Sequence, residues 1–191
     1  MRIADSISII EMFSEIAVAL DENRDALTGT DDIEQGHGKR MSGMFSAIET
    51  VFAGLEPAEW NPGHYFDVAA ETLLGMNGIE PQLYAAAFRR TGSIFIRYEQ
   101  LGVEEFGLAF AAMASGFRDQ ASEQPGAEVV VEAWETAATA YLDAERHGFS
   151  LSGCLQAAST AAQNFALGGT HFRPLAVSAS LVIRAMRDAL E

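Results

Sequence analysis

Apolar residues recur every three or four positions through almost the whole chain, and this pattern restricts it to helical folds. The first such segment, 6–25, has its apolar positions at Ile9, Met12, Phe13, Ile16 and Leu20. This spacing places the apolar side chains on one stripe of an amphipathic helix. Seven further segments of the same kind follow, and no pair of alternating strands stands out. We therefore expect an all-α protein.

The predicted helices are separated by short connections that contain glycine or proline, as helix ends and turns usually do. They cover residues 6–25, 41–54, 64–75, 81–101, 103–117, 129–147, 150–166 and 176–190. Short connections make consecutive helices antiparallel neighbours. We predict eight antiparallel helices in an up-and-down barrel or bundle, within a single domain that spans residues 1–191.

The charge balance limits the classes of partner. Lys and Arg number 12 against 27 Asp and Glu, which gives a formal net charge of -15. Such an excess of negative charge disfavours nucleic acid and anionic membrane surfaces as partners. The first twenty residues contain three acidic residues, unlike a signal peptide, and no apolar run reaches the length of a membrane span. We expect a soluble cytoplasmic protein.

The usual catalytic motifs are missing. There is no phosphate loop that ends in Gly-Lys-Ser/Thr, no G-x-S-x-G, and no pair of His at i and i+4. Cys154 is the single cysteine, so neither an internal disulfide nor a thiolate metal cluster is expected.

The connection between the first two predicted helices is the most polar part of the chain. Residues 27–41 read L-T-G-T-D-D-I-E-Q-G-H-G-K-R-M and contain Asp31, Asp32, Glu34 and His37. Carboxylates on a loop at a helix end are suited to a hard cation such as Mg²⁺ or Ca²⁺. An acidic, solvated connection between two helices explains the same composition. Composition alone leaves both interpretations open.

Four glycine-bearing connections follow odd-numbered predicted helices. They are residues 27–38, 75–81, 122–128 and 168–175. In an up-and-down bundle, connections of this kind all lie at one end. Backbone N–H groups and helix N-termini gathered there can bind an anion. The alternative is that these glycines only terminate helices.

Taken in order, these four regions resemble the nucleotide-binding subunit family of dihydroxyacetone kinase, called DhaL. The first loop of that family reads L-T-x-L-D-x-x-I-G-D-G-D-H-G-x-N-M. This chain is similar at Leu27, Thr28, Asp31, Ile33, His37, Gly38 and Met41. The second motif, G-G-A-S-G-P-L-Y-G, resembles N-G-I-E-P-Q-L-Y-A, which keeps Gly78, Leu83 and Tyr84. The third, G-D-K-T-M-x-D-A, is similar to the stretch that begins at Gly126. The fourth, R-A-S-Y-L-G-E-R followed by D-P-G-A, is similar to the sequence around Gly168 and Pro174.

The resemblance covers nearly the whole chain and implies an eight-helix barrel that holds Mg²⁺ with ADP or ATP at one rim. It implies Asp31, Asp32 and Glu34 as metal ligands. The positions implied to surround the nucleotide are His37, Gly38, Gly78, Glu80, Gly126, Gly168 and Arg173. The implied chemistry is phosphoryl transfer by positioning and Mg²⁺ charge neutralisation. The implied partner is the substrate-binding, DhaK-like kinase subunit, which holds the ketone on a His; a homo-oligomer is the other assembly considered.

Several substitutions depart from the family pattern at the expected phosphate and metal contacts. Glu80 replaces the Ser of the second motif, and a carboxylate beside a phosphate is repelled by roughly 1 kcal/mol at 4 Å even in bulk water. Pro81 replaces a glycine and removes an N–H donor. Ala127 and Glu128 stand where the third motif has Asp and Lys. These changes favour a decayed Mg-nucleotide site.

Three functions therefore stay open from the sequence. The first is a DhaL-like nucleotide-binding subunit with a decayed site. The second is a non-catalytic structural or regulatory partner of a kinase subunit that binds no nucleotide. The third is a remodelled rim for another ligand, such as a different sugar phosphate or a lone cation, near His171 and Arg173.

Overall fold

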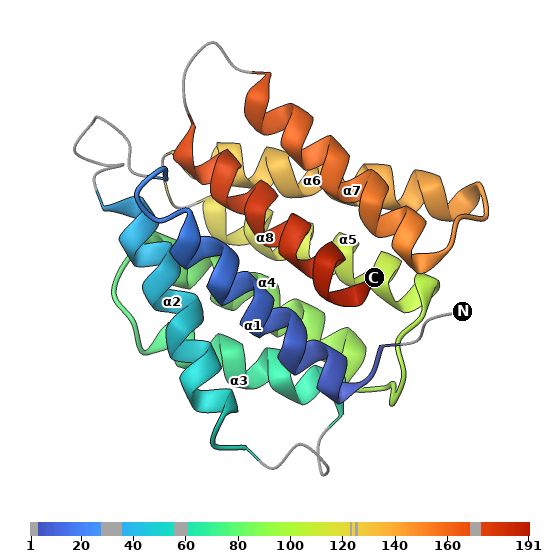
Figure 1. Cartoon of the computed structure of the whole chain (residues 1–191), viewed down its shortest axis with the longest axis horizontal. Helices are drawn as coiled ribbons and strands as arrows, with labels where there is room; N and C mark the ends of the chain where they lie inside the picture. Colours follow the sequence, from blue (N-terminus) through green and yellow to red (C-terminus); the bar gives the residue numbers. More distant parts are fainter. Residues whose placement is uncertain (1–3, 28–35, 56–60, 123, 125, 169–172) are drawn as a thin grey trace.

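The computed structural model describes residues 4–27, 36–55, 61–122, 124, 126–168 and 173–191. These residues contain eight α-helices (Figure 1): α1 (Ser6–Glu22), α2 (His37–Phe52), α3 (Pro62–Leu74), α4 (Ile79–Phe95), α5 (Val103–Ala121), α6 (Glu128–Arg146), α7 (Leu151–Leu167) and α8 (Pro174–Leu190). Within the described part, β-structure is confined to one isolated bridge between Ala4 and Leu101. The predicted all-α class is confirmed.

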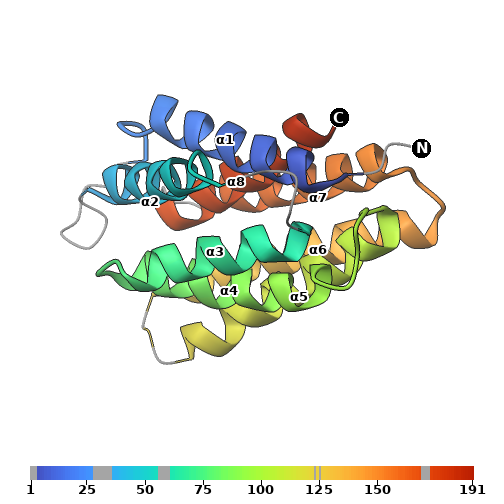
Figure 2. The same ribbon diagram turned by 90° about the horizontal axis from the view of Figure 1, so that it is seen from below.

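The helices form a closed ring. Each helix packs against the next one along the chain, and α8 packs against α1. Neighbouring helices run in opposite directions, as Figure 2 shows most clearly for α1 and α2. The antiparallel, up-and-down arrangement predicted from the short connections is therefore observed.

Aromatic rings fill much of the space between the helices on the α1–α5 side. Phe13 of α1 lies at the centre of one group, with ring centroids 5.1–6.3 Å from those of Phe45, Phe52, Phe66 and Phe88. Most of these pairs meet edge to face, which is a favoured geometry for aromatic rings. Rings of α5 and α6 form a further group that contains Phe110, Phe117, Trp134 and Tyr141.

Side chains cap three of the helices at their N-termini. The Asp5 carboxylate accepts from the Ser8 N–H at 3.0 Å, and the Ser150 hydroxyl accepts from the Gly153 N–H at 3.3 Å. Asp and Ser are common at this position, because their side chains satisfy the free N–H groups of a first turn. Asn61 caps α3 in the same way.

Several predicted boundaries were wrong; the fifth helix, for example, was expected to end at residue 117 but reaches Ala121. The fourth helix was expected to reach residue 101, but α4 ends at Phe95. Leu101 instead exchanges two backbone hydrogen bonds with Ala4, at 2.9 and 2.8 Å, and both residues are buried. The apolar pattern continues past Phe95 because Leu101 still joins the core, although its backbone has left the helix.

The second helix begins at His37, four residues before the predicted start. Gly36 adopts a left-handed conformation, with φ of 81°, at the N-cap position of α2. Glycine populates this region without the steric cost that other residues meet. His37 therefore lies in the first turn of a helix.

The last turns of α1, α3, α5 and α7 and the first turns of α2, α4, α6 and α8 share one end of the ring, which we call the rim (Figure 2). The predicted clustering of these helix ends is observed in the described residues. Four helix N-termini consequently bring their partial positive charges to the rim.

No helix in the described part of the chain combines the length and apolar character needed to cross a membrane.

Glycine allows two neighbouring helices to touch through their backbones. A Cβ atom built on Gly116 of α5 would lie 2.6 Å from the Ala87 Cα of α4 and 2.9 Å from the Ala86 carbonyl oxygen. Rigid backbone atoms cannot move aside as the end of a long side chain can. The α4–α5 contact therefore requires glycine at residue 116.

We expect Gly116→Ala to lower the free energy of unfolding by about 1–3 kcal/mol, because overpacking forces the two helices apart. Gly43→Ala in α2 is the matched control, since a Cβ there meets nothing within 4 Å. That substitution should raise stability by about 0.5–1 kcal/mol through helix propensity. Urea unfolding measures both, and equal effects of the two variants would contradict the close α4–α5 packing.

Candidate functional site

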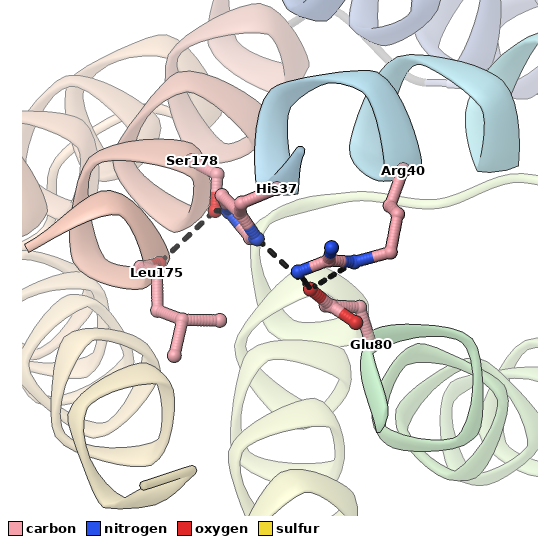
Figure 3. Close-up of polar contacts among 5 residues, drawn as sticks. All are labelled: His37, Arg40, Glu80, Leu175 and Ser178. Atoms are coloured by element: carbon pink, nitrogen blue, oxygen red, sulfur yellow. Dashed lines mark hydrogen bonds and ion pairs between the residues drawn. The ribbon is translucent and has the colours of Figure 1, made fainter. Parts of the chain in front are cut away.

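A cluster of polar side chains, three of them buried, lies at the rim, where the N-terminal ends of three helices meet. Figure 3 shows His37 and Arg40 from α2, Glu80 from α4, and Ser178 from α8. His37 and Ser178 are each 1% exposed and Glu80 is 6% exposed. Buried charged groups are rare in proteins unless they are paired. We call these four residues the rim cluster.

Hydrogen bonds link every member of the rim cluster. The His37 Nδ1 lies 3.0 Å from Glu80 Oε1, and its Nε2 lies 3.0 Å from the Ser178 Oγ. Arg40 donates from Nε and Nη2 to the same Glu80 oxygen, at 2.9 and 2.7 Å. The cluster thereby joins helices α2, α4 and α8, whose contributing residues are up to 141 positions apart in sequence.

The start of α2 brings His37 and Arg40 to the same place. Residues three apart lie on one face of a helix, so both side chains point toward α4. Gly38 fits between them because the first turn of α2 lies against the end of α1. A Cβ atom on Gly38 would lie 1.8 Å from the Arg24 carbonyl oxygen. Gly38 thus has a packing role, independent of any ligand.

The Glu80 carboxylate is the electrostatic centre of the cluster. Burial alone raises the pKa of Glu80, but hydrogen bonds from His37, from Arg40 and from its own backbone N–H outweigh burial and lower that pKa to about 2. The carboxylate is therefore ionised at neutral pH. It lies beside Gly78, where a Cβ atom would be 3.7 Å from Glu80 Oε2.

Two arrangements of hydrogens satisfy the bonds of His37. An ionised Glu80 can only accept, so the His37 Nδ1 carries a hydrogen in both. The Ser178 hydroxyl is also placed to donate to the Leu175 carbonyl at 3.1 Å, in which case His37 Nε2 donates to Ser178 and the imidazole is positively charged. If the hydroxyl turns to Nε2 instead, His37 is neutral.

The order Ser178–His37–Glu80 resembles the Ser-His-acid triads of hydrolytic enzymes. A nucleophilic serine must, however, reach its substrate and an oxyanion hole. Ser178 is 1% exposed, and its oxygen lies between His37 and the carbonyl of Leu175 one helical turn earlier. The contacts of Ser178 are those of a residue that orients His37.

The structure brings together four of the residues predicted from the sequence: His37, Gly38, Gly78 and Glu80. Arg40 and Ser178 were not predicted. Arg40 could have been predicted, because it lies three residues after His37 in the same helix. The sequence gives no comparable indication for Ser178, because its role depends on how α8 packs against α2.

The other predicted positions lie around the same rim. Gly126, with φ of 91°, donates its N–H to the Glu128 carboxylate at 2.9 Å just before α6 begins. Gly168 caps α7, and the Arg173 guanidinium lies over the Phe165 ring at 5.3 Å from its centroid.

The predicted metal ligands Asp31, Asp32 and Glu34 lie outside the described residues. Among the residues that are described, no group of three or more His, Cys, Asp or Glu side chains is placed to hold a metal ion. The rim cluster contains one carboxylate, that of Glu80, and His37 and Arg40 already bind it. It thus meets hydrogen-bond donors of the chain itself.

We expect Glu80 to stabilise the fold above its ordinary pKa of 4.5 and to lose this contribution as the pH falls toward 2, because the folded state holds the ionised form. The lost contribution is on the order of 3 kcal/mol. Unfolding of the wild type and of Glu80→Gln, followed between pH 6 and pH 2, should show the difference in stability shrinking with acid. The control is Glu128→Gln, which changes an exposed residue in the first turn of α6 at the same rim. The difference in stability between this variant and the wild type should stay constant over the same pH range.

A scan against models of protein families finds none that matches the chain, and a search of curated proteins finds no match. Membership in the DhaL family therefore stays a prediction from the order and spacing of the motifs.

Proposed function

We propose that the chain is a DhaL-like subunit of a cytoplasmic, dihydroxyacetone-kinase-type phosphotransfer system, and that it works at the rim with a decayed Mg-nucleotide site. The contact between the first and second motif regions carries this proposal. His37 and Glu80 are 43 positions apart, yet the His37 Nδ1 lies 3.0 Å from the Glu80 carboxylate. A shared site requires that residues from different motifs lie close together in space, and the order of the motifs along the chain does not show this.

The rim has features that suit a nucleotide phosphate. The N-termini of α2, α4 and α8 meet there, and free N–H groups at helix N-termini favour anions. His37 and Arg40 add donors that match phosphate oxygens. Mg²⁺, if held by Asp31, Asp32 and Glu34, would neutralise phosphate charge during transfer.

The ion pair of Glu80 favours a second candidate, a non-catalytic partner of the substrate-binding kinase subunit. The donors that would meet a phosphate already bind the Glu80 carboxylate, with Arg40 Nη2 at 2.7 Å. A nucleotide would have to displace a buried, ionised carboxylate from these donors, which costs binding free energy. The barrel would then act through its surface as a scaffold or regulator.

Thermal unfolding and calorimetric titration with ADP and ATP, with and without Mg²⁺, test the nucleotide site. The second candidate binds no nucleotide, so it predicts that millimolar Mg-ADP leaves the melting temperature unchanged. A retained site at 100 times its dissociation constant would add about 2.7 kcal/mol, which is a shift of several degrees for a chain of this size. A metal-dependent shift of that size would contradict the decayed-site assignment.

Binding to a dihydroxyacetone-binding kinase subunit tests the partner assignment in the same calorimeter. We expect saturable binding of that subunit, whether or not nucleotide is present. If neither the kinase subunit nor Mg-nucleotide binds the folded protein, both candidate functions fail.

A further inference from the structure

We propose that the core of the ring contains an internal binding site for a small neutral oxygen ligand, and that Tyr84 of α4 and Trp134 of α6 hold this ligand by hydrogen bonds. Water is the smallest member of this ligand class, and the hydroxyl group of a small alcohol is another. The inference concerns the buried core and goes beyond the proposed use of the rim.

Two polar atoms of this core have no hydrogen-bond partner among the residues that the structure describes. They are the hydroxyl oxygen of Tyr84 and the indole nitrogen Nε1 of Trp134. Tyr84 is 2% exposed and Trp134 is 0% exposed, so bulk water reaches neither atom. Buried hydroxyl and N–H groups nearly always have a partner, either in the protein or in an ordered water molecule. This pair of atoms therefore points to a ligand.

The two atoms belong to neighbouring side chains. Tyr84 and Trp134 lie in the second turns of their helices, and both rings pack against Phe117 of α5, with centroids 4.9 and 5.3 Å from it. Burial raises the pKa of Tyr84, and the Trp134 indole acts against this rise, as a donor close to the hydroxyl does. The two groups nevertheless do not meet in the geometry of a direct hydrogen bond. An oxygen placed between them would satisfy both.

The chemistry of the pair and the charge beside it select the ligand class. An indole N–H can only donate, whereas a tyrosine hydroxyl can donate or accept, so a ligand that bridges them must supply an acceptor. Glu80 lies one helical turn before Tyr84, and its negative charge also raises the pKa of Tyr84. An anion is therefore disfavoured. The rings of Phe45 and Phe88, which pack against Tyr84, carry no charge that would attract a cation or an anion. A neutral oxygen meets all of these conditions.

Tyr141 shows how the same core accommodates another buried tyrosine. Its side chain is buried, and its ring stacks on Phe110 with centroids 5.0 Å apart. Its hydroxyl donates to the carbonyl of Val103 at 2.9 Å. Tyr84 and Tyr141 thus share their burial and their aromatic neighbours, and they differ in whether the chain itself supplies a partner for the hydroxyl.

A high-resolution crystal structure of the whole chain tests the site directly, with crystals grown in the presence and absence of ethylene glycol as a probe. We expect density for one oxygen within about 3.2 Å of both Tyr84 Oη and Trp134 Nε1. The same isolated density in both crystals identifies water, whereas density that extends into the diol identifies a site for small alcohols. A direct hydrogen bond between Tyr84 and Trp134, or density beside only one of them, would overturn the proposal.

The melting temperature of Tyr84→Phe provides an independent measurement. Loss of a hydroxyl that hydrogen bonds to a ligand should lower the melting temperature by about 2–4 °C. Tyr141→Phe is the matched control and should cause a decrease of similar size, because its hydroxyl has a partner in the chain. Removal of a buried hydroxyl that has no partner is neutral or stabilising. An unchanged or higher melting temperature for Tyr84→Phe, beside a decrease for Tyr141→Phe, would therefore contradict the site. Neither measurement involves Mg-ADP or a kinase subunit, so the proposed function is judged separately.

Discussion

Contact between α1 and α8 closes the ring, and the rim cluster depends on this closure. Ser178 of α8 reaches His37 of α2 only because α8 returns to the helices at the beginning of the chain. Close backbone contacts and interlocked aromatic rings hold the remaining helices in place, for example where Gly116 lies against Ala87. The polar cluster is therefore a consequence of how an apolar core is packed.

Burial makes the charges of the rim cluster interdependent. Glu80 is stable inside the protein only because His37 and Arg40 donate to it, and removal of one partner leaves a buried charge without compensation. The same arrangement explains the two sides of the proposed function. The donors suit a phosphate, while the carboxylate that occupies them opposes one.

Much of the fold and part of the site could be predicted from the sequence. The helical period, the N-caps at Asp5 and Ser150 and the gathering of helix ends at one rim all follow from local patterns. Local patterns could not predict the end of α4, because Leu101 leaves the helix to pair with Ala4 across the chain. The sequence also indicated repulsion between Glu80 and a phosphate, but it did not reveal that Arg40 and His37 donate hydrogen bonds to Glu80.

By itself, the sequence determined the helices, their order and the antiparallel arrangement that short connections require. These properties depend on spacing along the chain, which a periodic pattern records. Only the tertiary structure decided that Glu80 is an ionised, buried counter-ion and that Ser178 orients His37. Those properties depend on distances between α2, α4 and α8, and such distances are set by the packing of large side chains and glycines across the whole ring.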